Sequence, residues 1–387
     1  MRFTTKLLPS RTNNLGVLLL NNPKPLHALT RDMVDCADDV LREWTNDPTI
    51  QAILIKSSLK ETKRASFCSG GDVKTIYLEG LEQQRHKGET ESGLPKPEDF
   101  FRYEYRVNHK IATCIDTIPI VSFWDGLVIG GGVGLSIHGK YRVATERTRL
   151  SMPECRIGLF PDVGSMWWMT RLLKQRSVAN YLALTGQQMK PEDLVYTGLA
   201  THYVPSNRLE ELESALAEAT SAHEKNGNAK GNDAIASVLM SFHEFIPTDQ
   251  CNLATNKTII EQTFRAATVE EIVENLKEAN TEFSISTLET LKKMSPTSMK
   301  VTMEGLNQGA KCKAIGEDLR MEYRMAKACI QPGSDFYEGI RSVLIDKDHS
   351  PKWSPATLEE VTDDMIQKYF APIHDEWKPS KDEVSKL

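Results

Sequence analysis

The sequence predicts an α/β fold in which a core of strands and helices is followed by a mainly helical C-terminal region. In the first half, short apolar runs bounded by glycine and polar turns alternate with amphipathic helical segments, which is typical of an α/β core. In the last third, the apolar residues recur only at helical spacing. A helix and a polar, glycine-containing linker separate the two parts. We therefore expect three regions, 1–205, 206–232 and 233–387.

The first predicted elements are a strand, a helix and a second strand. The first strand covers Gly16–Leu20. A helix is predicted over residues 30–45, because Thr30 is a favoured N-cap residue and apolar residues follow it at helical spacing. The chain returns as a strand over residues 50–56 and then reaches a short apolar run, Ser66–Cys68.

A polar segment and an aromatic helix come next. Residues 80–99 are rich in Gln, Glu, Gly and Pro, which predicts a surface loop. The helix is predicted over residues 100–114 and includes Glu104. From the sequence around it alone, Glu104 is interpreted as a residue on the helix surface.

Two glycine turns are candidates for binding an oxyanion. Gly130, Gly131 and Gly132 expose main-chain N–H groups, because no Cβ shields them. A short helix is predicted after them, and its unpaired N–H groups would favour negative charge. A second glycine pair, Gly70 and Gly71, follows the apolar run that ends at Cys68.

Two acids after prolines complete the candidate site. Pro153 precedes Glu154, and Pro161 precedes Asp162. Proline fixes its own φ and restricts the residue before it, so each acid leaves a stiffened backbone. Two acids facing an anion-stabilising turn are typical of acyl transfer, although each Pro-acid pair alone is also consistent with a solvated turn.

The later part of the chain is predicted to be largely helical. Ser206 is expected to cap a helix that ends near Ala219. Thr268 and Glu271 have the spacing of a capping box. The remaining predicted elements are strands at 141–144, 149–152 and 200–204, and helices at 167–173, 178–184, 272–279, 286–294, 296–308, 315–330 and 336–344.

Composition narrows the classes of function. The chain has 387 residues, 40% hydrophobic and 26% charged, which is enough to bury a sizeable core. A net charge of −6 argues against nucleic acid as a partner, and no apolar run is long enough to predict a membrane span. Seven cysteines without a C-x-x-C pattern argue against a disulfide framework or a zinc site. Cys155, beside Glu154, is interpreted as a small apolar residue because no partner base is evident.

Several motifs resemble one known family. They are FCSGGD at 67–72, FFRYEY at 100–105, GGGVGLS at 130–136, MPE at 152–154, GLFPDVG at 158–164, SPTS at 295–298 and DFYEGIRSVLIDKDHSPKW at 335–353. Together they resemble the crotonase (enoyl-CoA hydratase/isomerase) superfamily and, within it, the 3-hydroxyisobutyryl-CoA hydrolases. The similarity spans nearly the whole chain. It implies a crotonase-like spiral of ββα units with an extended C-terminal helical region.

The resemblance also implies a reaction. The thioester of 3-hydroxyisobutyryl-CoA, with 3-hydroxypropionyl-CoA as a second substrate, would be hydrolysed to the hydroxy acid and CoA in valine catabolism. Main-chain N–H groups of Gly71 and Gly131 would form the oxyanion hole. Glu154 would attack the acyl carbon or activate water, and the sequence leaves both routes open. Asp162 would orient water or substrate and assist proton transfer.

Further residue roles follow from the resemblance alone. The hydrolases place a substrate-contacting acid at the position of Glu104, which gives that residue a second interpretation. CoA is part of the substrate, and neither a metal nor a separate cofactor is expected. Trp167 and Trp168 stand where the hydrolases have smaller residues and a Tyr-Phe pair, so they belong either to the acyl pocket or to the core. The residues expected at CoA are Ser66, Ser69, Gly71, Asp72 and Val73, and those expected at the acyl group are Glu104, Gly131, Glu154 and Asp162.

Two other functions stay open. Superfamily hydratases that use two acids carry one at the position of Gly134 and a glycine at the position of Asp162, so the present arrangement disfavours hydration of an enoyl-CoA. Relatives of the hydrolases also serve as structural proteins of mitochondrial ribosomes. In this chain the glycines and acids of the proposed site are all present, and no basic tail is seen.

The last three residues predict a location. Ser385-Lys386-Leu387 matches the tripeptide read as a peroxisomal address, so peroxisomal import through its receptor is expected. The alternative is a mitochondrial presequence, which the basic residues Arg2, Lys6 and Arg11 would suit. The oligomeric state is left open.

Overall fold

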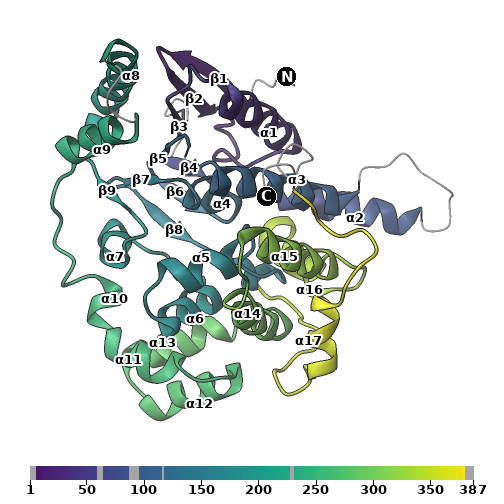
Figure 1. The fold of residues 1–387 in the computed structure, drawn as a ribbon. Helices are drawn as coiled ribbons and strands as arrows, with labels where there is room; N and C mark the ends of the chain where they lie inside the picture. The colour runs from purple at the N-terminus through teal and green to yellow at the C-terminus, as the bar shows by residue number, and fades with distance from the viewer. Residues whose placement is uncertain (1–5, 59–63, 87–95, 116, 227–230, 380–387) are drawn as a thin grey trace. The chain divides into compact units, whose positions relative to one another are not determined.

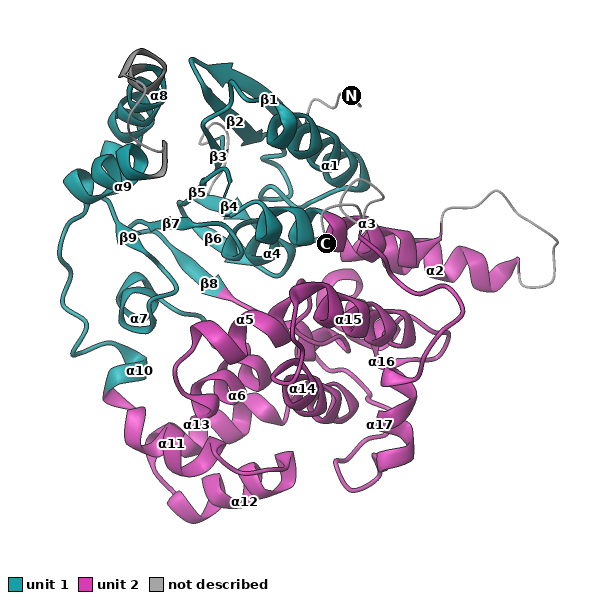
Figure 2. Cartoon of the chain, in the orientation of Figure 1, with its two compact units in different colours: residues 1–71, 107–150, 188–254 teal, residues 72–106, 151–187, 255–387 magenta. Residues whose placement is uncertain are grey.

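The computed structural model describes residues 6–58, 64–86, 96–115, 117–226 and 231–379. Two compact units are formed, each from three separate segments of the chain (Figure 2). Unit 1 consists of residues 1–71, 107–150 and 188–254, and unit 2 of residues 72–106, 151–187 and 255–387. The three consecutive regions expected from the sequence stay a prediction.

Unit 1 is built on a mostly parallel sheet (Figure 1). The edge strand β1 runs antiparallel to β2, and each later neighbour is parallel to the strand before it in the sheet. Parallel neighbours need crossover connections, which fits the predicted alternation of strands and helices. The strand order is β1 (Leu7–Thr12), β2 (Leu15–Leu20), β3 (Ala52–Ser57), β5 (Ile120–Trp124), β7 (Tyr141–Ala144) and β9 (His202–Tyr203).

A second, smaller sheet has the order β4 (Ser66–Cys68), β6 (Leu127–Ile129) and β8 (Arg149–Ser151). Its first two strands are parallel, with Ser66 opposite Leu127. The chain therefore leaves both strands at the same edge, and the two glycine turns follow there.

The core of unit 1 forms where two helices cover one face of the larger sheet. Alternate strand residues share a face, so Leu15 and Val17 of β2 lie beside their partners in β3 and join one buried cluster. Helices α8 (Leu209–Asn226) and α9 (Gly231–Phe242) contribute to the same cluster. The other helical segments with most of their residues in unit 1 are α1 (Arg31–Asn46), α4 (Gly131–Ile137), α7 (Pro191–Thr197), α10 (Asn252–Thr255) and the 3-10 turn Ser206–Arg208.

Unit 2 is mainly helical. Helix α14 (Pro296–Gly309) packs against α5 (Ser165–Leu172), α6 (Arg176–Thr185) and α15 (Ile315–Cys329). Helix α3 begins in unit 2 and passes into unit 1 at residue 107. The other helical segments are α2 (Val73–Arg85), α3 (Pro97–Thr113), the 3-10 turn Glu154–Ile157, α11 (Lys257–Phe264), α12 (Val269–Ala279), α13 (Glu282–Leu291), α16 (Asp335–Ile340), the π-helix Arg341–Ile345 and α17 (Asp363–Phe370).

Most predicted elements are confirmed, but strand β1 and helix α2 were not predicted, and two predicted details are wrong. The capping box of Thr268 and Glu271 is present at α12. The loop predicted over residues 80–99 is wrong at both ends, because α2 continues to Arg85 and α3 begins at Pro97, and residues 87–95 lie outside the described part. Ser206 does not cap α8. Its N–H and hydroxyl donate to the Glu146 carboxylate instead, and α8 starts three residues later.

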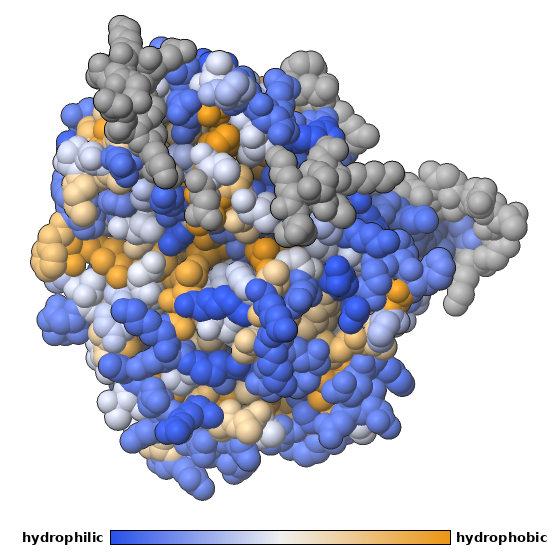
Figure 3. Space-filling view, viewed as in Figure 1, coloured by the Kyte–Doolittle hydropathy of each residue, from blue (hydrophilic) through white to orange (hydrophobic). Residues whose placement is uncertain are grey.

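The surface face drawn in Figure 3 is largely hydrophilic, with hydrophobic residues gathered in several smaller areas. Exposed large hydrophobic residues include Met240 and Phe245 in unit 1 and Ile285 in unit 2. Such residues are normal when they are scattered. Among the residues that the structure describes, no helix combines the length and apolar character needed to cross a bilayer.

Candidate active site

Three buried acids gather in unit 2. Glu104 lies on α3, Glu154 opens the 3-10 turn 154–157, and Asp162 follows in the loop before α5. Their exposed fractions are 3%, 6% and 4%. The interpretation of Glu104 as a surface residue is therefore wrong, because its helix turns this side chain inward. The interpretation of Glu154 and Asp162 as solvated turn residues is also wrong, because both side chains are buried.

The acids are close enough for their charges to interact. Burial raises the pKa of Glu104 well above its ordinary value, and the charges of Asp162 and Glu154 raise it further. Burial and the charge of Asp162 likewise raise the pKa of Glu154. Burial raises the pKa of Asp162 to about 7, although a hydrogen bond from Tyr105 acts in the opposite direction. Burial and the mutual repulsion of the three acids thus disfavour their charged forms, and shifted pKa values of this kind are typical of groups used in acid–base catalysis.

Tyr105 is a member of this cluster that the sequence did not reveal. Its hydroxyl donates to Asp162 Oδ2 at 2.9 Å, and its side chain is fully buried. It follows Glu104 directly in α3, so one helix supplies both an acid and the hydroxyl that binds a second acid. The only signal was its place in the aromatic motif at 100–105.

Two carboxylate oxygens of the cluster are buried without a partner. Among the described residues, neither Glu104 Oε1 nor Glu154 Oε2 has a hydrogen-bond donor. Leaving a buried acceptor unpaired costs roughly 1–3 kcal/mol, so such atoms call for an explanation. A substrate hydroxyl or a water molecule at these oxygens would remove that cost.

The segment that carries Glu154 is fixed through its neighbour. The carbonyl oxygen of Cys155 accepts the N–H of Ser295 at 3.0 Å. The Cys155 thiol contacts Thr302 Oγ1 at 3.4 Å, and burial raises its pKa to about 12. A buried thiol that stays protonated is a weak nucleophile. The interpretation of Cys155 as a packing residue is consistent with this environment.

The two glycine turns lie side by side in unit 1. Gly70 has φ of 106°, and a Cβ at this position would lie 3.4 Å from the Ile129 carbonyl oxygen and 3.9 Å from the Gly131 nitrogen. Glycine permits both this φ and this close approach. Gly131 is the first residue of α4, so its N–H has no acceptor within that helix. The structure thus brings the turns of Gly71 and Gly131 together, as the predicted oxyanion hole requires.

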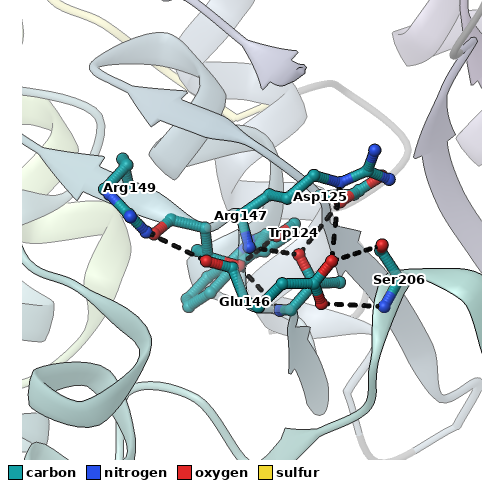
Figure 4. Close-up of polar contacts among 8 residues, drawn as sticks. Trp124, Asp125, Glu146, Arg147, Arg149 and Ser206 are labelled. Carbon is teal, nitrogen blue, oxygen red and sulfur yellow. Dashed lines mark hydrogen bonds and ion pairs between the residues drawn. The ribbon is translucent and has the colours of Figure 1, made fainter. Parts of the chain in front are cut away.

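An ion pair between the buried Asp125 and the partly exposed Arg147 anchors the strand that leads to Gly131 (Figure 4). Asp125, just before β6, is 2% exposed and accepts Arg147 Nε–H at 2.8 Å. The Thr145 hydroxyl donates to the same carboxylate at 2.9 Å. The 145–148 turn is tied back to β5 as well, because the Thr148 hydroxyl donates to the Trp124 carbonyl. These bonds fix the entry into β6.

The residues expected at CoA have local structural roles. The hydroxyls of Ser66 and Ser69 donate to the carbonyls of Leu26 and Pro25, each at 2.9 Å. Asp72 caps α2 by accepting the Thr75 N–H at 3.2 Å. Val73 is the first residue of α2, and Gly71 forms an isolated bridge with Leu29. Their contact with CoA stays a prediction.

Two other sequence hypotheses concern the tryptophans and metals. Trp168 is buried, and its indole N–H donates to Ser165 Oγ at 3.1 Å. The Arg171 guanidinium stacks over the Trp167 ring, with its Cζ atom 3.4 Å from the ring centroid. Core packing therefore accounts for Trp168.

In the described ranges, no group of three or more His, Cys, Asp or Glu residues is arranged to hold a metal ion.

A family profile described as enoyl-CoA hydratase/isomerase matches residues 15–370. The chain belongs to the enoyl-CoA hydratase/isomerase family. The predicted family resemblance and the predicted fold class are confirmed. Within this family, the chain is 40% identical to the mitochondrial 3-hydroxyisobutyryl-CoA hydrolase of Gallus gallus, over 95% of this chain and 89% of the relative. The Homo sapiens enzyme of the same name is 41% identical, over 92% and 86%.

Solved structures of the family agree with the fold. A carnitinyl-CoA dehydratase from Mycobacterium thermoresistibile has a TM-score of 0.82 and 30% identity, over 97% of this chain and 99% of that chain. An enoyl-CoA hydratase from Rhodobacter sphaeroides 2.4.1 has a TM-score of 0.80 and 32% identity, over 95% and 98%.

The expected peroxisomal location is wrong. The relatives that cover most of the chain are named as mitochondrial enzymes. The tripeptide Ser385-Lys386-Leu387 lies outside the described residues, and a match of three residues is short enough to arise by chance. The expected partnership with a peroxisomal import receptor depended on the same tripeptide and is left without support.

Proposed function

We propose that this protein is an acyl-CoA thioester hydrolase that converts 3-hydroxyisobutyryl-CoA to the free hydroxy acid and CoA. The observation that carries the proposal is the buried trio of Glu104, Glu154 and Asp162, in which Glu154 keeps a carboxylate oxygen without a partner among the described residues. The choice of substrate is supported by the names of the similar mitochondrial 3-hydroxyisobutyryl-CoA hydrolases. Their names also support a mitochondrial location and a role in valine breakdown.

The glycine turns are assigned to the charge that develops on the thioester oxygen. Main-chain N–H groups of Gly71 and Gly131 would bind this oxygen and stabilise the tetrahedral oxyanion. Loss of one such donor typically costs about 3–4 kcal/mol in the transition state.

Glu154 is assigned to the acyl carbon. In one route its carboxylate attacks that carbon, the C–S bond breaks, CoA leaves as a thiolate, and water then hydrolyses the mixed anhydride. In the other route the carboxylate removes a proton from water as the water oxygen attacks the carbon directly, and the C–S bond then breaks with loss of CoA as a thiolate. Both routes require an ionised Glu154. Its raised pKa makes this carboxylate more basic than an exposed one, which favours proton removal.

Asp162 and Glu104 are assigned to proton transfer and to recognition of the acyl hydroxyl. With a pKa of about 7, Asp162 changes its charge in the pH range where a proton must move to or from water. Burial and the neighbouring acids raise the pKa of Glu104 well above its ordinary value, which favours its protonated form, and that form can donate a hydrogen bond to the oxygen of the substrate hydroxyl. These acids would distinguish hydroxyacyl thioesters, 3-hydroxypropionyl-CoA included, from unsubstituted ones.

Hydration of an enoyl-CoA is the second candidate, because the two solved structures with the highest TM-scores given above are named as a hydratase and a dehydratase. The position of the second acid argues against it. Gly134, where two-acid hydratases carry a carboxylate, is a buried glycine of α4. The second acid of this chain is Asp162 instead.

A panel of thioesters tests the proposal. Thiol release and loss of enoyl absorbance would be followed for 3-hydroxyisobutyryl-CoA, 3-hydroxypropionyl-CoA, acetyl-CoA and crotonyl-CoA. Thiol release from the hydroxyacyl thioesters above the rate for acetyl-CoA is expected. Loss of crotonyl absorbance without thiol release would establish a hydratase. Inactivity on all four, together with binding to a mitochondrial ribosomal particle, would establish the scaffold alternative.

A further inference from the structure

The backbone that follows Asp162 is strained. Val163 has φ of 58° and Gly164 has φ of 78°. Glycine adopts such values readily, whereas a β-branched residue in this region costs of order 1–3 kcal/mol. Val163 is fully buried. Surrounding contacts must therefore hold the turn in this conformation.

Some of these contacts lie within the turn itself. The Ser165 N–H and hydroxyl both donate to the Asp162 carbonyl, at 3.1 and 2.5 Å. The Trp168 indole N–H in turn donates to Ser165 Oγ. All of these bonds join residues 162–168 to one another. They close the turn but do not attach it to another element of unit 2.

Glu322 attaches the main chain of the turn to α15. Its Oε2 accepts the Gly164 N–H at 2.6 Å, and its Oε1 accepts the Met166 N–H at 3.0 Å. The Glu322 side chain is fully buried. Both α5 and α15 belong to unit 2 (Figure 2). A carboxyl group from α15 thus accepts hydrogen bonds from two main-chain N–H groups of the turn, those of Gly164 and Met166.

Glu322 replaces a missing helix cap. Helix α5 starts after Gly164, which has no side chain to accept the first N–H groups of the helix. Glu322 accepts one of them, from Met166. Asp318, one turn earlier in α15, accepts the next, from Trp167, at 3.2 Å. Only Glu322 also contacts Gly164, inside the strained turn.

We propose that Glu322 is a positioning residue for Asp162, fixing the 162–166 turn to α15 so that the Asp162 carboxyl points to the reacting group. This inference rests on the proposed function, in which Asp162 acts on water or substrate. Tyr105 holds the tip of the Asp162 side chain through its hydroxyl. Glu322 holds the backbone from which that side chain projects. Glu322 acts through main-chain geometry and has no role on the substrate itself.

Two matched variants test this inference in the thiol-release assay. Glu322→Gln keeps the size of the side chain but places an amide N–H₂ against one of the two N–H donors. Its kcat is expected to fall by about 10–100-fold with KM little changed, because a small misplacement of a reacting group costs about this much. Glu317→Gln makes the same change at an exposed carboxylate of the same helix, which accepts the Lys313 N–H at 2.8 Å. Its kcat is expected to stay within about three-fold of the wild type.

Wild-type kcat in Glu322→Gln, or equal losses in both variants, would overturn the inference. Should Glu322→Gln yield no folded protein, Glu322→Asp provides the same test, because it keeps a carboxylate but withdraws it by one methylene. A selective loss of kcat is again expected, and wild-type kcat would overturn the proposal.

A double mutant distinguishes positioning from general damage. If Glu322 acts through Asp162, adding Glu322→Gln to Asp162→Asn should cost less than about three-fold beyond the single Asp162 variant, because coupled residues are not additive. Losses that multiply would overturn the inference and leave the proposed function intact. Full activity of Asp162→Asn alone would instead remove the assigned role of Asp162, so the two failures are distinguishable.

Discussion

Replacing Tyr105 with Phe should shift the pH dependence of the reaction. The substitution removes a single hydrogen bond, from the Tyr105 hydroxyl to Asp162 Oδ2 at 2.9 Å, and keeps the buried ring. This bond stabilises the ionised form of Asp162 and lowers its pKa. The charged or titratable groups that interact with Asp162 from the surrounding elements are Glu104, Glu154, Glu322 and Cys329, and none of them is altered.

The magnitude follows from the strength of the bond. A hydrogen bond to a charged group contributes about 1.5–3 kcal/mol, and 1.36 kcal/mol corresponds to one pKa unit. Loss of the bond should raise the pKa of Asp162 by roughly one to two units above its value of about 7. The acid limb of kcat/KM should then move to higher pH by the same amount, and activity on the alkaline side should be largely retained.

The assay is thiol release from the best hydroxyacyl thioester between pH 5 and pH 9. Tyr103→Phe is the matched control, because Tyr103 lies on the same helix and contacts Arg106 through its ring, which the substitution keeps. Its pH profile should equal that of the wild type. An unchanged acid limb in Tyr105→Phe, or an equal loss at every pH, would refute the assignment of Asp162 as the group that titrates.

Two further predictions concern stability. The pKa of Asp162 is raised from 3.8 to about 7, so its ionisation destabilises the fold as pH rises through this window. Asp162→Asn should therefore stabilise the protein at pH 8, by up to about 4 kcal/mol, and the gain should vanish below pH 4; equal melting shifts at both pH values would contradict this. Arg147→Met leaves the buried Asp125 carboxylate without its cation and should cost about 2–4 kcal/mol in denaturant unfolding, less than for a fully buried pair because Arg147 is partly exposed. Arg149→Met removes bonds to carbonyl oxygens only and should cost less than about 1 kcal/mol, so equal losses would remove the special role of the ion pair.

The sequence identified the parts of the site that depend on local chemistry. Glycine turns expose N–H groups, and prolines stiffen the backbone before an acid. The motifs therefore marked Gly131, Glu154 and Asp162. The parallel pairing of β4 and β6 then brought the two glycine turns together, as expected for strands that end at the same edge.

The parts that depend on tertiary packing were missed. Helix α2 was not predicted, because Gly80 was interpreted as the start of a loop. A Cβ at this position would lie 2.2 Å from the Tyr337 hydroxyl, so close packing rather than turn formation explains this glycine. The strand β1 was hidden by Pro9, which is tolerated because β1 is an edge strand. In each case a residue that usually breaks an element is accommodated by its surroundings.

The buried acids of α15 left a signal that could have been used. Asp318 and Glu322 fall in phase with Ile315, Leu319 and Cys329 on the buried face of the helix. Charged residues are rarely buried unless they bind a specific group. Acids on an otherwise apolar helix face therefore indicate a buried contact, although only the fold shows that this contact is the turn after Asp162.

The most direct test of the central claim is thiol release by Glu154→Gln. On the hydroxyacyl thioester that the wild type cleaves best, kcat should fall by at least about 100-fold, because the glutamine side chain neither attacks the acyl carbon nor accepts a proton from water. Cys155→Ala, at the next residue, is the matched control and should retain activity. Cleavage by Glu154→Gln at the wild-type rate, with activity lost in Cys155→Ala, would contradict the account and place the chemistry on the thiol.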